Sequence, residues 1–157
     1  MLYVGCHLSA SDGNLAMVRT AKELGANTFA FFTRNPRGSK AKKEDPVDSA
    51  KAVQALQEDN FGRLVAHGAY TMNLCTAAPD ARAFACEVLC DDLRRMAALP
   101  GNFYNFHPGS HVGQGRIQVF RRSAMRCARH WPPAIPQPCC WKPWRERAVR
   151  SAADLKS

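Results

Sequence analysis

The sequence predicts an α/β protein built on a parallel β-sheet with helical crossovers. Short apolar stretches recur through the first 115 of the 157 residues, and segments with helical periodicity separate them. The stretches are apolar almost throughout instead of alternating with polar residues, which is typical of strands that are buried on both faces. Strands that alternate with helices in this way favour a parallel sheet.

Four strands are expected, at residues 2–6, 28–32, 63–66 and 102–106, where aliphatic and aromatic side chains concentrate. The fourth strand stops at Pro108 and Gly109, which cannot continue a regular strand.

Three helices are expected between these strands. The first carries an apolar face and ends at Gly25. Asp48 is expected to cap the second helix, because an aspartate oxygen can accept hydrogen bonds from the first free amides. The third and longest helix is expected to begin at Pro79 and Asp80. The helices therefore fill the gaps between the four strands.

Polar residues stand where each expected strand ends. His7 follows the first strand, a loop with Asn35 and Arg37 follows the second, and His67 and His107 follow the third and fourth. The carboxyl ends of parallel strands emerge at one rim, and such a rim is where a TIM (β/α)8 barrel builds its site. A complete barrel needs eight strands and about 250 residues. The sequence thus predicts the first four βα units of a barrel, followed by an irregular tail.

The composition changes abruptly near Gly115. Residues 1–115 hold 12 Lys/Arg and 11 Asp/Glu, whereas residues 116–157 hold 10 and 2, so most of the net charge of +9 lies in the second part. All three tryptophans and five of the ten prolines also lie there. We therefore expect two regions, a half barrel at 1–115 and a disordered basic tail rich in Trp, Pro and Arg at 116–157.

Several classes of protein are disfavoured by the composition. The seven cysteines are odd in number and form no CxxC pair, which argues against a disulfide scaffold and a cysteine-rich zinc site. The sequence shows no membrane-spanning apolar run and no signal peptide, so the expectation is a cytoplasmic protein without a membrane partner. Motifs for a Ser/His/Asp triad, a phosphate-binding glycine loop or a dinucleotide fold are also missing.

His67 and His107 are the first candidates for a functional site. Neutral imidazole is the commonest metal ligand among protein side chains, and zinc sites often combine it with carboxylates. Two histidines 40 residues apart are not in themselves a metal signature, and each could instead cap its strand by bonding a loop carbonyl. For His7 and His111 this ordinary structural role is the favoured interpretation.

The loop after the second strand offers candidates for binding nucleic acid. The Arg37 guanidinium matches the geometry of a phosphate, and the Asn35 amide can bond base or sugar edges, although an ordinary solvated turn would have the same composition. Tyr70 could stack on a base or sugar, or could only cover the mouth of the barrel.

Together these segments resemble the endonuclease IV family of abasic-site endonucleases. The matching stretches are residues 3–10, 32–37, 67–74 and 105–111, of which the last, Asn-Phe-His-Pro-Gly-Ser-His, is the most specific. The resemblance implies an eight-stranded TIM barrel, usually monomeric, with three zinc ions. It also implies base-excision repair, in which a zinc hydroxide hydrolyses the phosphodiester 5′ to an abasic site in double-stranded DNA. By position, His67 and His107 match two zinc ligands, and the loop positions that engage DNA match Asn35, Arg37 and Tyr70.

The resemblance ends after Gly115, and the reading frame suggests why. Where the family continues with a Leu-Glu-Thr-like motif, this chain has Cys139, Cys140, Trp141 and Lys142. Read from the third base of each codon, these residues encode Leu-Leu-Glu whatever synonymous codons are used. We hypothesise that residues from about Arg116 onward are a frameshifted translation. The chain would then keep at most one partial zinc site, show little or no activity, and leave edge strands open to aggregation.

Two other functions remain open from the sequence. A xylose-isomerase-like sugar isomerase or epimerase also places metals at the strand ends of a barrel. A non-enzymatic nucleic-acid binder could act through the basic tail, because Lys and Arg side chains neutralise phosphates. A preference for abasic DNA over sugars would argue against the sugar isomerase or epimerase. Loss of DNA binding on deletion of residues 116–157 would indicate the nucleic-acid binder.

Overall fold

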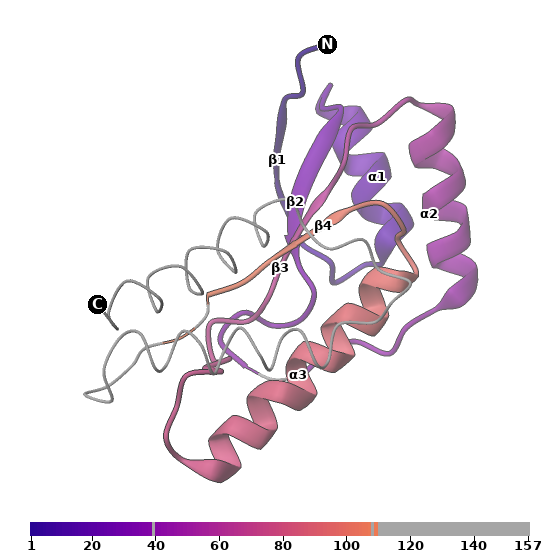
Figure 1. Ribbon diagram of the computed structural model, residues 1–157. Helices are drawn as coiled ribbons and strands as arrows, with labels where there is room; N and C mark the ends of the chain where they lie inside the picture. Colours follow the sequence, from indigo (N-terminus) through magenta and orange to yellow (C-terminus); the bar gives the residue numbers. More distant parts are fainter. Residues whose placement is uncertain (39, 108, 110–157) are drawn as a thin grey trace.

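The structure is a computed structural model that describes residues 1–38, 40–107 and 109 (Figure 1). In this part, four strands alternate with three helices, in the predicted order. The strands are β1 (Gly5–Leu8), β2 (Thr28–Phe32), β3 (Val65–His67) and β4 (Phe103–Asn105), and the helices are α1 (Asn14–Glu23), α2 (Pro46–Glu58) and α3 (Pro79–Ala97). The expected tail at 116–157 and His111 lie outside the described residues.

The four strands form one parallel sheet in the order β1-β2-β3-β4, and the helices lie together on one side of it (Figure 1). The register pairs Phe32 with His67 and His67 with Asn105, so the ends of these strands are level. The α/β class and the arrangement expected for the first half of a barrel are confirmed. The polar residues predicted at the strand ends therefore share one rim.

The core lies between the sheet and the helices. Alternate strand residues point toward the helices and are buried, including Phe29, Phe31 and Tyr104. They pack with apolar side chains from the helices, such as Val18 and Leu89. Within the described residues, no helix is long and apolar enough to cross a membrane. The opposite face of the sheet carries the side chains of the rim.

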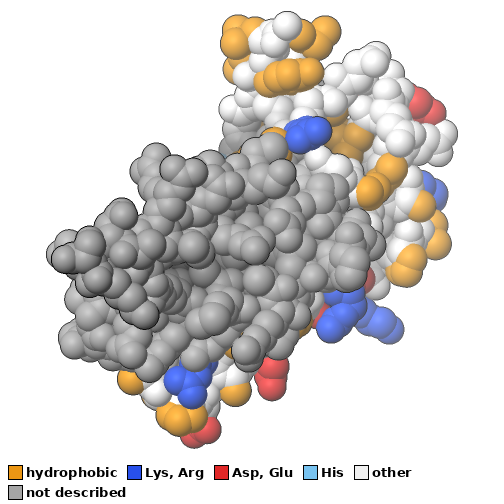
Figure 2. All heavy atoms as spheres, viewed as in Figure 1, with side chains coloured by type: hydrophobic (Ala, Val, Ile, Leu, Met, Phe, Trp, Pro, Cys, Tyr) orange, Lys and Arg blue, Asp and Glu red, His pale blue; other side chains and the backbone are white. Residues whose placement is uncertain are grey.

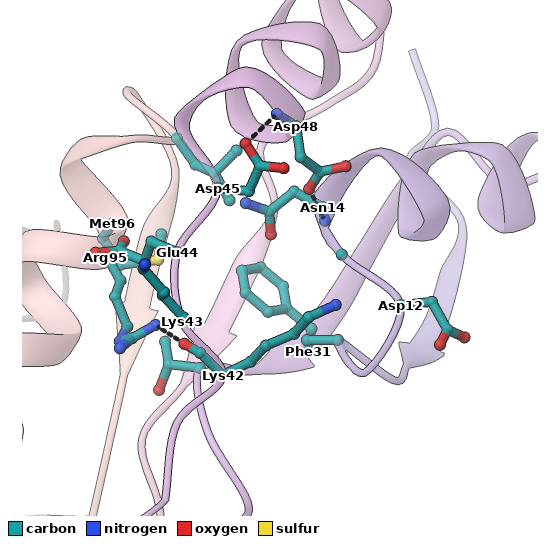
Figure 3. Close-up of a pocket in the computed structure, with 14 residues that line it drawn as sticks. Asp12, Asn14, Phe31, Lys42, Lys43, Glu44, Asp45, Asp48, Arg95 and Met96 are labelled. Carbon is teal, nitrogen blue, oxygen red and sulfur yellow. Dashed lines mark hydrogen bonds between the residues drawn. The ribbon is translucent and has the colours of Figure 1, made fainter.

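The expected cap of the second helix is wrong. Asp45 caps α2 by accepting hydrogen bonds from the amides of Val47 and Asp48, and Pro46 follows at the first helical position. Asp48 instead caps a different helix, because its carboxylate accepts from the amides of Asn14 (2.6 Å) and Leu15 (3.4 Å) at the start of α1 (Figure 3). This cap crosses between two neighbouring helices, so local sequence could not reveal it.

The first strand is also displaced from its expected position at residues 2–6. It begins at Gly5 and includes His7, while Leu2 is 80% and Val4 is 59% exposed. Figure 2 shows hydrophobic side chains gathered at this N-terminal end of the molecule. In the described part of the chain β1 pairs only with β2, so it is an edge strand and is not buried on both sides. The third strand begins two residues later than expected and ends one residue later, so that it includes His67. The fourth strand is shorter than expected by one residue at each end.

Candidate metal and nucleic-acid site

His67, Tyr70 and His107 meet at the rim. The ring centroids of His67 and His107 are 5.2 Å apart, and the Tyr70 ring lies 5.7 Å from each of them. His67 is the last residue of β3, Tyr70 is in the loop that follows, and His107 follows β4. Parallel pairing of β3 with β4 therefore brings together two histidines that are 40 residues apart.

A hydrogen bond selects the tautomer of His67. Its Nδ1 lies 2.7 Å from the carbonyl oxygen of Gly68, and because a carbonyl can only accept, Nδ1 carries the proton. The lone pair of the imidazole is then on Nε2, which is the arrangement found in histidines that bind metals. The strand-capping role and the ligand role considered from sequence are thus compatible, since each uses a different ring nitrogen.

The separation of the two imidazoles suits a shared zinc ion. Zinc–nitrogen bonds are about 2.1 Å long, so two imidazoles on one tetrahedral zinc have centroids about 5 Å apart. The observed centroid distance is 5.2 Å. Among the described residues, no group of three or more His, Cys, Asp or Glu side chains could hold a metal ion. Within the described residues, the two histidines therefore stand as a pair, with no third side chain of these types placed to complete a metal site.

Phe32, which was not predicted as a site residue, lies between the rings of this cluster. Its centroid is 4.8 Å from that of His7, 5.1 Å from His67 and 5.3 Å from Tyr70. As the last residue of β2 it stands between β1 and β3 on the face away from the helices. Its position at a strand end, level with His67, is the signal that could have identified it. His7 joins the cluster through Phe32.

The loop with Asn35 and Arg37 is folded by its own hydrogen bonds. The side-chain oxygen of Asn35 accepts a hydrogen bond from the backbone amide of Arg37 (3.0 Å). The backbone amide of Asn35 donates to the carbonyl of Lys40 (3.2 Å). Both Asn35 and Arg37 are exposed. The Tyr70 amide donates to the carbonyl of Pro36 (3.0 Å), so this loop lies directly beside the cluster. The structure thus places the loop that carries Asn35 and Arg37 against the backbone of Tyr70, whose ring contacts both histidines.

Arg34, immediately before this loop, is a buried charge that sequence reasoning missed. Its guanidinium forms ion pairs with Asp91 and Asp92 of α3, at 2.7 Å to each. Burial by itself lowers the pKa of Arg34, but the hydrogen bonds and charges of Asp92 and Asp91 outweigh it, and the pKa lies above its usual value. The partners are 57 and 58 residues away, so nothing near Arg34 in the sequence signals the pairing.

An open groove of about 550 Å³ runs between the loops that follow β1 and β2. Its walls include His7, Phe32, Asn35 and Lys42. The groove thus begins at His7 and Phe32 of the ring cluster and extends along the exposed loop.

Comparison with known proteins identifies the family. A family model described as "Xylose isomerase-like TIM barrel" matches residues 18–134. The probable endonuclease 4 of Akkermansia muciniphila is 56% identical over 115 residues, which is 73% of this chain and 42% of that protein. The probable endonuclease 4 of Alkaliphilus oremlandii is also 56% identical over 115 residues, or 41% of its length. The chain thus spans less than half of the length of these relatives.

Solved structures show the same relationship. Endonuclease IV from Thermus thermophilus superimposes with a TM-score of 0.67 and 30% sequence identity, covering 82% of this chain and 46% of that one. D-psicose 3-epimerase from Clostridium cellulolyticum superimposes with a TM-score of 0.57, but its 13% identity indicates a shared fold alone. The resemblance to endonuclease IV is therefore confirmed, and the chain belongs to the xylose isomerase-like TIM barrel family.

Proposed function

We propose that the rim binds DNA at an abasic site and contributes to zinc-dependent hydrolysis of the phosphodiester 5′ to that site. The proposed cellular process is DNA base-excision repair, and the proposed location is the cytoplasm. The observation that carries the proposal is the convergence of His67, Tyr70 and His107 beside the exposed loop with Arg37. The similarity to proteins named endonuclease 4 supports it.

His67 and His107 are the proposed zinc ligands, because one nitrogen of His67 is already committed to Gly68 and the two rings are suitably spaced. A bound zinc ion would act as a Lewis acid and supply hydroxide at neutral pH. His67 and His107 would hold that ion at the rim, beside the loop that carries Arg37.

Asn35, Arg37 and Tyr70 are the proposed DNA contacts. The exposed Arg37 guanidinium suits a phosphate, and Asn35 suits a sugar or base edge. Tyr70 is 59% exposed, and its ring faces the histidine pair, where it can stack against an extruded sugar. Extruding an abasic nucleotide costs little because the nucleotide has no base to unpair.

For this chain we propose weak or no incision. Two histidines provide fewer ligands than a catalytic zinc site, which needs three protein ligands and an open position. We also propose that residues 1–115 form one region and that the tail from about Arg116 is translated out of frame. Sequencing the gene tests this last point. The shifted frame encodes Leu-Leu-Glu at 139–142, and the idea fails if that frame does not continue with a Leu-Leu-Glu-Thr-like motif.

The decisive experiment compares two duplexes that differ only in one tetrahydrofuran abasic analogue. With zinc present, we expect the full chain to bind the abasic duplex more tightly than the intact one and to cut neither at an appreciable rate. Equal affinity for both duplexes would refute the proposed recognition. Rapid zinc-dependent incision would refute the proposed loss of activity.

A variant that lacks residues 116–157 serves as the control for binding by charge alone. If DNA binding depends on the basic tail, the deletion abolishes DNA binding. In that case the full chain should bind the abasic and intact duplexes equally. If the rim binds DNA, the preference survives the deletion. D-psicose and related sugars should neither compete with the duplex nor be converted.

A further inference from the structure

The segment that carries the DNA-contact candidates is attached to α3 at both ends. At one end, Arg34 donates to Asp92 through Nε (2.8 Å) and to Asp91 through Nη2 (2.7 Å), and Nη2 also forms an ion pair with Asp92 (2.7 Å). At the other end, Arg95 donates to the carbonyl of Lys42 (2.8 Å; Figure 3) and, through Nε, to Asp91 (2.8 Å). The carboxylate of Asp91 is therefore common to both attachments.

The same cluster reaches the strand that leads to His107. The hydroxyl of Tyr104 in β4 donates to Asp92 over 2.6 Å. The Asp92 side chain is fully buried and the Arg34 side chain is 5% exposed, so these bonds are made away from water. One carboxylate thus connects the loop after β2 with the strand three residues before His107.

We propose that Arg34, Asp91 and Asp92 are positioning residues for the DNA-contact loop. They set the location of Asn35 and Arg37, and through the Tyr70 amide bond to Pro36 the location of Tyr70, relative to β4 and His107. The part of this inference that concerns DNA rests on the proposed function. The part that concerns the loop stands on the contacts alone.

Stability alone does not account for a buried arginine here. A buried ion pair can often be replaced by apolar side chains of similar volume without loss of stability, because both charges lose their hydration on burial. Apolar packing cannot supply the direction of a guanidinium that bonds carboxylates through fixed donors. The cluster therefore gives the loop one defined position, which is what a surface needs for recognising a shaped ligand.

The test separates position from stability with a triple variant, Arg34→Met, Asp92→Leu and Tyr104→Phe. It replaces all three members of the Arg34–Asp92–Tyr104 contact together, so that none of these three side chains is left as a polar group opposite an apolar replacement. Arg94→Gln is the matched control, because Arg94 bonds the same Asp91 (3.0 Å) from an exposed position on the same helix. Amide hydrogen exchange is measured at Asn35 and Tyr70, with Val18 in α1 as the reference.

In the triple variant we expect the amides of Asn35 and Tyr70 to exchange at least about tenfold faster while Val18 is unchanged, because the loop loses its Arg34 bonds to α3 and no substituted residue lies in α1. The abasic duplex should bind about tenfold more weakly, as expected when a loop must be ordered on binding. In Arg94→Gln neither quantity should change.

Unchanged exchange at Asn35 and Tyr70 in the triple variant would overturn the inference. If Val18 also exchanges faster, the fold has loosened, and Arg34→Lys then decides. Lysine keeps the positive charge but lacks the planar set of donors of the guanidinium, so amide exchange at Asn35 and Tyr70 should accelerate. Full protection of these amides with lysine would overturn the role of the guanidinium geometry. Absence of any preference for the abasic duplex in the unmodified chain would refute the proposed function instead, and the exchange experiment would still decide the positioning role.

Discussion

The backbone amide of Tyr70 donates a hydrogen bond to the carbonyl oxygen of Pro36 over 3.0 Å. This bond joins the loops that follow β2 and β3, and so places the tyrosine beside Asn35 and Arg37. The same tyrosine ring lies 5.7 Å from the centroids of both His67 and His107. Residues from three successive strand ends thus form one surface, although no two of these ends are close in sequence.

Zinc binding should depend on both histidines of the rim. His67→Ala or His107→Ala should weaken zinc binding at least about tenfold, because each removes one of two ligands from the ion. His7→Ala is the control, since the His7 ring contacts Phe32 (4.8 Å) and lies in the same cluster. Titration with a zinc-sensitive dye measures the affinity. An equal loss in His7→Ala would contradict the assignment.

Arg37→Ala should weaken DNA binding and reduce its salt dependence. A phosphate contact releases about one counterion, so the slope of log affinity against log salt concentration should become less steep by about 1. Fluorescence anisotropy at several salt concentrations measures this slope. Lys40→Ala, in the same exposed loop, should have the smaller effect on affinity for the abasic duplex. The assignment of Arg37 fails if the two variants are indistinguishable.

Asp48→Ala should destabilise the fold through α1, although Asp48 lies in α2. The change removes the acceptor for the amides of Asn14 and Leu15 and should cost about 1–2 kcal/mol of unfolding free energy. Asp12→Ala is the control, because the exposed Asp12 carboxylate points away from this cap (Figure 3) and should change stability by less than about 0.5 kcal/mol. Chemical denaturation provides both values.

Asp91 should make stability sensitive to acid. Burial by itself raises the pKa of this carboxyl, but the hydrogen bonds and charges of Arg95 and Arg34 outweigh it, and the pKa lies below its usual value. Its contribution is therefore present above the unfolded pKa of about 3.9 and is lost as pH falls through the lower folded value. Asp91→Asn should lose stability above about pH 4, and its deficit against the unmodified protein should shrink in stronger acid. Denaturation at a series of pH values measures the difference.

Gly68→Ala should strain the contact between β3 and β4. A methyl group at position 68 would lie 2.5 Å from the Tyr104 hydroxyl oxygen and 3.2 Å from Phe106 Cβ. Overpacking of this kind costs about 1–3 kcal/mol. Gly38→Ala provides the comparison, since its methyl would approach no atom closer than 3.6 Å. Similar denaturation midpoints for the two variants would show that Tyr104 moves freely.

The elements were predicted well wherever the signal was local. Helix α3 begins at Pro79 as expected, because proline at a first helical position is a property of that residue alone. The cap of α1 was missed because Asp48 is 34 residues from Asn14 and acts across a helix–helix contact. The position of β1 was missed because Leu2, Tyr3 and Val4 have the composition of a buried strand but lie at an exposed edge.

The amino-acid sequence by itself determined the α/β class, the order of the strands and the residues available for a site at the rim. Apolar periodicity and turn residues act over a few neighbours, so they can be read directly. The tertiary structure alone decided that His67 and His107 face each other, that Phe32 lies between the rings and that Arg34 is held by Asp91 and Asp92. These relationships depend on strand register and helix packing, which bring together groups that are tens of residues apart.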